Sequence, residues 1–114
     1  MSAYQLDILQ KIPNQKYDVI ISNPPYIPIQ EINNLEHSVQ YYDPIDALTD
    51  YDDGMTFYRR IFDISSRILN QGGIMIFEFG TPDQQNQIIN IFDGYSYQTF
   101  KDLARRPRVI MFQS

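Results

Sequence analysis

The sequence predicts an α/β fold whose sheet is mostly parallel and is closed by an antiparallel hairpin. Two observations predict it: strand-like and helix-like segments alternate along most of the chain, and two strand-like segments finish it with no helix between them. Alternating strands and helices produce parallel strands that are joined by right-handed crossovers. A short polar connection at residues 102–107 joins the last two strands, which is typical of a hairpin and makes one strand antiparallel.

Residues Tyr17–Ser22 predict the first strand. The segment is short, rich in β-branched residues and apolar on both faces, which is typical of a parallel strand buried between helices. Asn23-Pro24-Pro25 ends it, because proline cannot donate a hydrogen bond to a neighbouring strand. Residues 26–54 follow without a clear period, so we expect a long excursion with one helical turn near residues 30–35. Excursions of this length often serve as lids or binding segments.

An apolar stripe predicts a helix at residues 56–70, which Gly72-Gly73 then stops. The stripe consists of Phe57, Ile61, Ile64 and Ile68. Residues 74–79 predict the second strand. The remaining elements are a helix from Thr81-Pro82-Asp83-Gln84 to about residue 92 and two strands at residues 96–101 and 108–112. That helix start combines a threonine cap, an early proline and the glutamine of a capping box.

The composition is that of one globular domain and limits the classes of partner. With 114 residues, 43% of them hydrophobic, the chain can bury a modest single core. It has no cysteine, which excludes disulfides and thiolate metal sites and fits a reducing cytoplasm. The formal charge of −5 disfavours nucleic acid as a partner, and no apolar run approaches the roughly 20 residues of a membrane span.

Asn23-Pro24-Pro25-Tyr26 is the candidate site, because ligands of open α/β sheets bind just beyond the carboxyl ends of the strands. The side-chain oxygen of Asn23 and the carbonyl oxygen of Pro24 can each accept a hydrogen bond from a planar NH2 group. Two acceptors on a stiff turn would direct a weakly nucleophilic nitrogen at an electrophilic methyl group, and Tyr26 would form a flat wall. The alternatives are ordinary turn chemistry or a polyproline-type ligand.

Residues 17–27, Tyr-Asp-Val-Ile-Ile-Ser-Asn-Pro-Pro-Tyr-Ile, resemble the signature of the HemK/PrmC-type protein-(glutamine-N5) methyltransferases. Asn-Pro-Pro-Tyr alone is shared with DNA amino-methyltransferases and does not decide between the two. Further matches to the protein enzymes are Asp43-Pro44 with Ala47-Leu48, Asp53-Gly54-Met55 with Phe57-Tyr58-Arg59, Gly72-Gly73, Glu78 with Gly80, and Lys101-Asp102-Leu103 with Arg108-Val109. The resemblance spans nearly the whole chain.

The resemblance implies the C-terminal half of a class I, Rossmann-like methyltransferase sheet that uses S-adenosyl-L-methionine (SAM). The implied reaction methylates a glutamine side chain in a peptide chain release factor or, in a sister branch, in a ribosomal protein. Asn23, Pro24 and Tyr26 would be catalytic and, with Pro25, would hold the substrate amide. Asn23 would also face the cofactor, and Asp7 would meet its adenine edge. The alternative for Asp7 is a solvated helix residue.

This chain departs from the sequence pattern of the family in one respect. The family's Gly-rich loop and the acidic residue after the next strand are absent, so residues 1–114 are expected to be a partial methyltransferase domain that binds SAM weakly. The strand Tyr17–Ser22 would then have an open edge, across which two copies pair or swap, unless the chain is only marginally stable. The alternatives to a protein methyltransferase are a nucleic-acid amino-methyltransferase and a non-catalytic fragment that retains the fold.

Several other residues carry weaker hypotheses. His37 is expected to be a solvated loop residue, and Glu78 either serves the site or pairs at the rim of the sheet. The irregular spacing of five aspartates predicts a solvated acidic lid and no metal site. These are Asp43, Asp46, Asp50, Asp52 and Asp53. Tyr41 and Tyr42 line the substrate entrance or pack as ordinary aromatics, and the three arginines between residues 105 and 108 decorate the hairpin.

Overall fold

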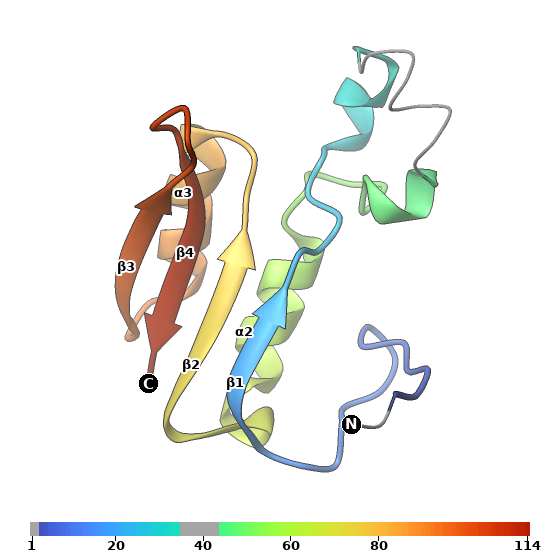
Figure 1. Cartoon of the computed structure of the whole chain (residues 1–114). Helices are drawn as coiled ribbons and strands as arrows, with labels where there is room; N and C mark the ends of the chain where they lie inside the picture. Colours follow the sequence, from blue (N-terminus) through green and yellow to red (C-terminus); the bar gives the residue numbers. More distant parts are fainter. Residues whose placement is uncertain (1–2, 35–43) are drawn as a thin grey trace.

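The computed structural model describes residues 3–34 and 44–114, which form a four-stranded sheet with two helices on one face (Figure 1). The strands are β1 (Tyr17–Ser22), β2 (Leu69–Glu78), β3 (Ser96–Lys101) and β4 (Pro107–Gln113). The helices are α2 (Thr56–Ile68) and α3 (Pro82–Ile91). Two short 3-10 helices, η1 (Ile29–Asn34) and η2 (Ile45–Ala47), precede α2. The predictions on His37, Tyr41, Tyr42 and Asp43 lie outside the described residues.

The strands lie in the order β1-β2-β4-β3, and the α/β prediction with its closing hairpin is confirmed. β1 pairs with β2 in parallel, and α2 is the crossover between them. β4 runs antiparallel to both β2 and β3, so the other three strands point the same way. Their carboxyl ends therefore meet at one edge of the sheet, where Asn23 follows β1 and Phe79 follows β2.

The core lies between the helices and one face of the sheet. Met75, Phe77 and Phe79 alternate along this face and are fully buried, whereas the residues between them remain partly exposed. Phe92 at the end of α3 stacks on Phe112 of β4 with ring centroids 4.4 Å apart. No helix in the described part of the chain is both long and apolar enough to cross a membrane.

The boundaries of α2 and β2 differ from the prediction. The helix ends at Ile68, and Leu69 already has extended dihedral angles, because residues 69–73 pair or turn with the start of β1 instead of adding a helical turn. The buried stripe also contains Tyr58, while Phe57 is only partly buried. Tyr58 tolerates full burial because its hydroxyl donates a hydrogen bond to the backbone carbonyl of Glu78. The turn predicted near residues 30–35 corresponds to η1, and η2 was not predicted.

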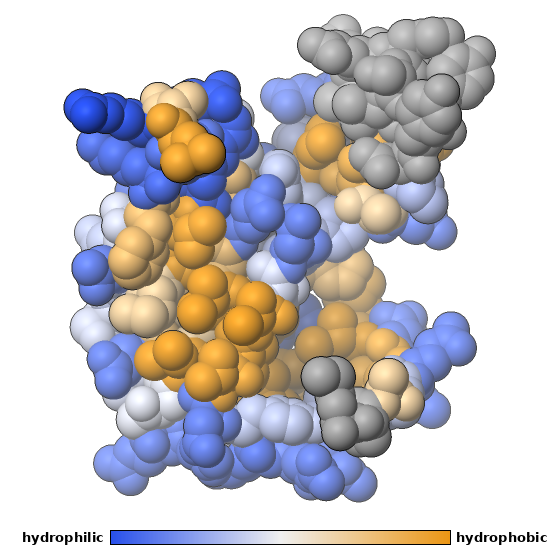
Figure 2. All heavy atoms as spheres, in the orientation of Figure 1, coloured by the Kyte–Doolittle hydropathy of each residue, from blue (hydrophilic) through white to orange (hydrophobic). Residues whose placement is uncertain are grey.

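The prediction that β1 is buried between helices is wrong, whereas its predicted open edge is confirmed as far as residues 3–34 and 44–114 are concerned, since none of their strands pairs with that edge. Both helices cover the same face, so Val19 and Ile21 on the other face are 49% and 74% exposed. Ile74 and Ile76 of β2 point to this helix-free face as well, because they alternate with the buried residues of that strand. Figure 2 shows apolar atoms gathered over the middle of this face.

Candidate active site

The turn Asn23-Pro24-Pro25-Tyr26 lies at the carboxyl edge of the sheet and borders two hollows. Asn23 is exposed and lines both, whereas Pro24 is buried and anchors the turn. The first hollow, of about 160 Å³, lies against the carboxyl ends of β1 and β2 and the beginning of β4. It is lined by Ile21, Ser22, Asn23, Ile76, Phe77, Glu78 and Val109. The second, of about 90 Å³, is lined by Asn23, Tyr26, Ile27, Ala47 and Leu48.

The acceptor groups of this turn divide into free and occupied ones. Neither the side chain of Asn23 nor the carbonyl oxygen of Pro24 makes a hydrogen bond with the described residues. The carbonyl oxygen of Tyr26, in contrast, accepts a hydrogen bond of 2.7 Å from Nε2 of Gln84. The turn thus holds the carbonyl of Tyr26 against α3 and presents the side chain of Asn23 to both hollows, whereas Pro24 is buried and lines neither hollow.

Tyr26 forms a half-buried wall of the second hollow. A Cβ atom on Gly80 would lie only 2.8 Å from Cε2 of Tyr26, so the ring rests directly on the glycine backbone. Burial raises the pKa of the Tyr26 hydroxyl above its ordinary value, the negative charge of Glu78 raises it further, and Arg108 opposes both. The hydroxyl therefore remains protonated at neutral pH and can donate as well as accept a hydrogen bond.

Glu78 ends β2 and lines the larger hollow with Asn23. Its carboxylate makes no hydrogen bond or ion pair with the described residues, so the predicted pairing at the rim is not observed there. Its charge still acts on the neighbouring Tyr26. A partly buried carboxylate beside the Asn23 side chain makes this hollow attractive for groups that donate hydrogen bonds or carry positive charge.

We expect Glu78→Gln to lower the pKa of the Tyr26 hydroxyl, because the substitution removes a negative charge that opposes ionisation. The pKa should stay above its ordinary value, since burial, the larger cause, persists. An NMR titration of the Tyr26 ring resonances measures the change. Asp93→Asn, which removes the same charge beyond the far end of α3, should leave that titration unchanged; an equal shift there would mean that Glu78 has no special proximity to Tyr26.

The segment before α2 braces the turn from its other side. The amide of Ile27 donates to the carbonyl of Leu48 at 2.9 Å, and the amide of Ile29 donates to the carbonyl of Asp52 at 3.0 Å. Gly54 is in the left-handed region at φ +88°, and a Cβ atom there would lie 2.4 Å from the carbonyl oxygen of Tyr26. This residue must be glycine for both its dihedral angle and its contact.

The acidic residues of this segment organise it, which corrects the prediction of a merely solvated lid. The carboxylate of Asp50 accepts hydrogen bonds from the backbone amides of Asp52, Gly54 and Thr56 at 2.9–3.0 Å. Burial alone would raise the pKa of Asp50, but the hydrogen bonds from Thr56 and the other amides outweigh it and lower the pKa. The described residues contain no group of acidic or histidine side chains that could hold a metal ion.

Asp7 lies outside both hollows. It is exposed, and its carboxylate accepts a hydrogen bond from the amide of Leu9 at 3.0 Å within a short turn, so it is not the predicted alternative of a helix residue. Arg60 of α2 fixes this segment through a hydrogen bond of 2.7 Å to the carbonyl of Ile8. The role of Asp7 at an adenine edge stays a prediction.

Gln84 is the functional candidate that sequence reasoning missed. The sequence pattern indicates only a capping-box role for Gln84, and the backbone amide of Gln84 does donate a hydrogen bond to the Thr81 hydroxyl at 3.2 Å. Its side chain, however, accepts from the amide of Gly80 instead of Thr81, and reaches across to Tyr26. No local sequence pattern indicates the contact between Gln84 and Tyr26, because these two residues are 58 positions apart in the sequence.

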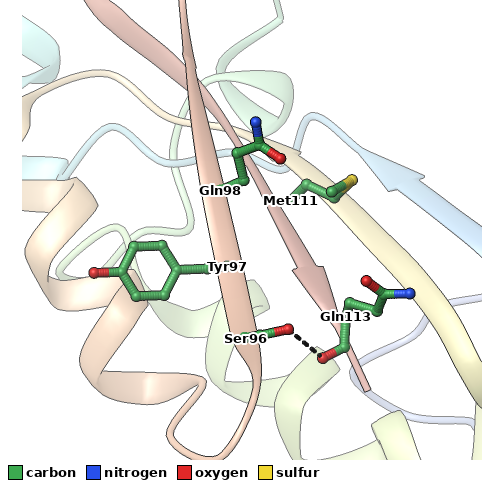
Figure 3. Close-up of a pocket in the computed structure, with 5 residues that line it drawn as sticks. All are labelled: Ser96, Tyr97, Gln98, Met111 and Gln113. Carbon is green, nitrogen blue, oxygen red and sulfur yellow. Dashed lines mark hydrogen bonds between the residues drawn. The ribbon is translucent and has the colours of Figure 1, made fainter.

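A further hollow of about 100 Å³ lies away from the turn, between β3 and β4, and is lined by Ser96, Tyr97, Gln98, Met111 and Gln113 (Figure 3). Ser96 Oγ donates a hydrogen bond of 3.4 Å to the carbonyl of Gln113, and the Tyr97 ring points to the opposite side of β3 from Gln98. The hollow contains no acid or base, and it lies at the start of β3. It does not belong to the candidate site.

The two hollows beside Asn23 are small compared with sites for cofactors. Sites that enclose a drug-sized molecule have volumes of about 300–1,000 Å³. The larger hollow here measures about 160 Å³, so the described residues alone do not enclose a molecule as large as SAM. They offer a ledge with room for a small planar group such as a carboxamide.

Comparison with known proteins connects this arrangement to methyltransferases. The family model described as Eco57I restriction-modification methylase matches residues 3–100. The release factor glutamine methyltransferase of Clostridium acetobutylicum is 41% identical over 110 residues, which cover 92% of this chain and 38% of the relative. The enzyme of the same name from Bacillus subtilis is 32% identical over 112 residues, with 94% and 39% covered.

Solved structures agree with these sequence matches. The release-factor-specific protein-(glutamine-N5) methyltransferase of Alicyclobacillus acidocaldarius matches with a TM-score of 0.55 and 26% identity, over 86% of this chain and 48% of that one. A methyltransferase of Pyrococcus furiosus shares the fold, with a TM-score of 0.57 at 19% identity over 87% of this chain and 41% of that chain. This chain spans about two fifths of the length of the curated relatives it matches. The chain therefore belongs to the Eco57I methylase family of methyltransferases and is homologous to the HemK/PrmC-type release factor glutamine methyltransferases.

Proposed function

We propose that this chain supplies the amide-holding part of a SAM-dependent methyltransferase that modifies a glutamine side chain in a peptide chain release factor. The observation that carries the proposal is the exposed Asn23 side chain, which lines two hollows and has no partner among the described residues; the carbonyl oxygen of the adjacent Pro24 also has no partner there. The names of the homologous enzymes support the choice of glutamine as substrate. A ribosomal protein is the alternative substrate, and either would place the chain in the cytoplasm.

In this proposal the turn itself selects and orients the carboxamide. The NH2 group of the substrate carboxamide donates one hydrogen bond to the side-chain oxygen of Asn23 and one to the carbonyl oxygen of Pro24. Both N–H bonds then lie in the plane of the acceptors, so the nitrogen presents its remaining face to the methyl donor. The acceptors also stabilise the positive charge that develops on nitrogen during transfer. Pro25 and Tyr26 confine the amide plane from the sides.

SAM supplies the electrophilic methyl group when it is bound. We propose that residues 1–114 form a partial methyltransferase domain and that Asn23 and Asp7 contribute to the cofactor side. Most of the cofactor contacts would come from a polypeptide part like the region of the longer relatives that this chain does not cover. Isothermal calorimetry on this chain should then detect SAM weakly or not at all. A micromolar dissociation constant would contradict this division.

A chimera tests the proposed reaction. The upstream region of the Clostridium acetobutylicum relative is joined to this chain, and transfer of labelled methyl groups from SAM to a release factor is measured. The resemblance to the HemK/PrmC-type enzymes implies methylation at the glutamine of a Gly-Gly-Gln motif in the release factor, and we expect the label there, with the intact relative as the positive control. A chimera that folds and binds SAM but methylates no glutamine would overturn the proposal and leave a fragment that retains only the fold.

A nucleic-acid amino-methyltransferase is the second candidate, because the matching family model is described by a restriction-modification methylase. Adenine and cytosine also present a planar NH2 group to such a turn. The formal charge of −5 opposes binding to a phosphate backbone. Filter binding with double-stranded and single-stranded DNA separates the two candidates, since only a nucleic-acid enzyme should retain DNA at moderate salt.

We also propose that two copies of this chain associate through the open edge of β1 when no other polypeptide covers it. The support is a strand edge that no other described strand pairs with, together with the exposed β-branched side chains of Val19 and Ile21 on the face of the same strand. Sedimentation equilibrium should detect a dimer at high concentration, and Ile21→Lys should shift it to monomer by placing a charge on the edge. A wild-type chain that stays monomeric and well folded at high concentration would contradict this association.

A further inference from the structure

Gln84 is a buried polar side chain with two partners in different parts of the fold. It is only 7% exposed, and Nε2 donates to the carbonyl oxygen of Tyr26 at 2.7 Å while Oε1 accepts from the amide of Gly80 at 2.9 Å. Burial of a carboxamide is unfavourable unless its groups find such partners. The side chain therefore has one compatible arrangement, in which the first turn of α3 is fastened to the turn after β1.

Gly80 completes this fastening. A Cβ atom on Gly80 would lie 2.8 Å from both the Tyr26 ring and Oε1 of Gln84, so only a glycine allows the ring, the backbone and the glutamine to meet. The carbonyl of Gly80 accepts a hydrogen bond of 2.9 Å from Nη1 of Arg108, which fixes the same peptide from β4. Both faces of the loop between β2 and α3 are thus held in place against Tyr26.

The hydrogen bond from Gln84 also restrains the part of the turn that would hold a substrate. Because Gln84 binds the Tyr26 carbonyl, the peptide group that follows Tyr26 has a fixed orientation. The two prolines before it have fixed φ angles, so little rotational freedom remains between Tyr26 and Asn23. A turn with its last carbonyl fixed inward restrains Asn23, whose side chain lines both hollows.

We propose that Gln84 is a positioning residue for the amide-holding turn: it acts through Tyr26, and without its Nε2 donor the turn binds a carboxamide less well although the domain stays folded. The inference rests on the proposed function of the turn. It differs from a purely structural role because it assigns the effect to a single donated hydrogen bond, which a chemically defined substitution can remove and restore.

Gln84→Glu provides that substitution. The carboxylate keeps an acceptor for the amide of Gly80 but loses the donor, and it places a negative charge against the Tyr26 carbonyl. Gln87→Glu introduces the same charge at an exposed position of the same helix and is the matched control. Binding of a Gly-Gly-Gln peptide to the full chain is followed by NMR shifts of Asn23 and Tyr26, with a Gly-Gly-Glu peptide as the negative control.

At neutral pH we expect Gln84→Glu to weaken binding of the Gly-Gly-Gln peptide about tenfold, the worth of one hydrogen bond, while Gln87→Glu binds like the wild type. Burial raises the pKa of the introduced carboxyl group, so lowering the pH to about 5 should protonate it, return a donor to Tyr26 and recover most of the affinity. The wild type over the same pH range corrects for other titrations. Unchanged affinity at neutral pH, or a loss that low pH does not relieve, would overturn the proposal.

The NMR spectrum separates this inference from the proposed function. In the wild type the Gln84 side-chain amide protons should exchange slowly with solvent, and the Gly80 amide should be shifted by the Tyr26 ring, with or without peptide. If these signatures are present and the wild type binds no Gly-Gly-Gln peptide, the amide-holding function fails and the positioning role fails with it. If the wild type binds the peptide but the Gln84 protons exchange freely, the positioning role alone is overturned.

Discussion

Asn23→Ala should lower the rate of glutamine methylation by about 10²–10³-fold, the size of effect seen when one preorganised hydrogen-bonding group is removed from a developing charge. The substitution deletes one of the two free acceptors of the turn and leaves the amide held only by the Pro24 carbonyl. The measurement is kcat/KM of the chimera for a release factor. Stability should change by no more than about 0.5 kcal/mol, because Asn23 is exposed and has no partner among the described residues.

Asn86→Ala provides the control for this prediction, because Asn86 is an exposed asparagine on α3 that lies on neither hollow. It should leave both the rate and the stability unchanged. Asn23→Asp is informative as well, since it keeps an acceptor but adds a charge at the place where the methyl donor must approach. If Asn23→Ala retained full activity, the side chain would have no part in catalysis and the turn would be a structural feature only.

Gly54→Ala should destabilise the chain by about 2–4 kcal/mol, which combines the strain of a left-handed alanine with a steric clash. Gly54 has a φ of +88°, and its new Cβ would lie 2.4 Å from the carbonyl oxygen of Tyr26. That oxygen belongs to the backbone and is held by Gln84, so it cannot move aside cheaply. The substitution should also disturb the NMR resonances of Tyr26.

Gly72→Ala separates the two contributions. Gly72 has a φ of +78°, but nothing lies within 4 Å of a Cβ atom built there. Gly72→Ala should therefore lower the free energy of unfolding only by the strain of a left-handed alanine, about 1–2 kcal/mol. Urea unfolding of the two variants and the wild type measures the difference. Equal losses would show that Gly54 is required for its dihedral angle alone and that the Tyr26 carbonyl is free to shift.

The sequence was sufficient to predict the elements whose signals are local. A periodic apolar stripe identified α2, and a short apolar run identified residues 74–79 of β2. The short polar connection at residues 102–107 identified the closing hairpin, and the prolines after Ser22 marked the turn. The burial of β1 was mispredicted because burial depends on what covers a strand: Val19 and Ile21 have the composition of a covered strand, yet no described helix packs on their face.

The supporting contacts of the turn could not be predicted for a different reason. Asp50 resembles any other solvated aspartate in the sequence, and Gln84 resembles an ordinary helix-capping residue. The tertiary structure decides their partners. The carboxylate of Asp50 accepts hydrogen bonds from backbone amides within residues 52–56, and the side chain of Gln84 donates to the carbonyl of Tyr26, 58 positions earlier. Gly54 was noticed only through a family resemblance, because its contact with Tyr26 has no sequence pattern.

The brace of hydrogen bonds around Tyr26 gives this stretch of chain a self-contained geometry. Leu48, Gly54, Gly80 and Gln84 all belong to the described part of this chain, as does the turn that they support. If the turn holds the amide as proposed, the turn and the residues that support it can be inherited or exchanged as one block. Exchange of this block between related enzymes should carry substrate preference with it, whichever protein part delivers the methyl group.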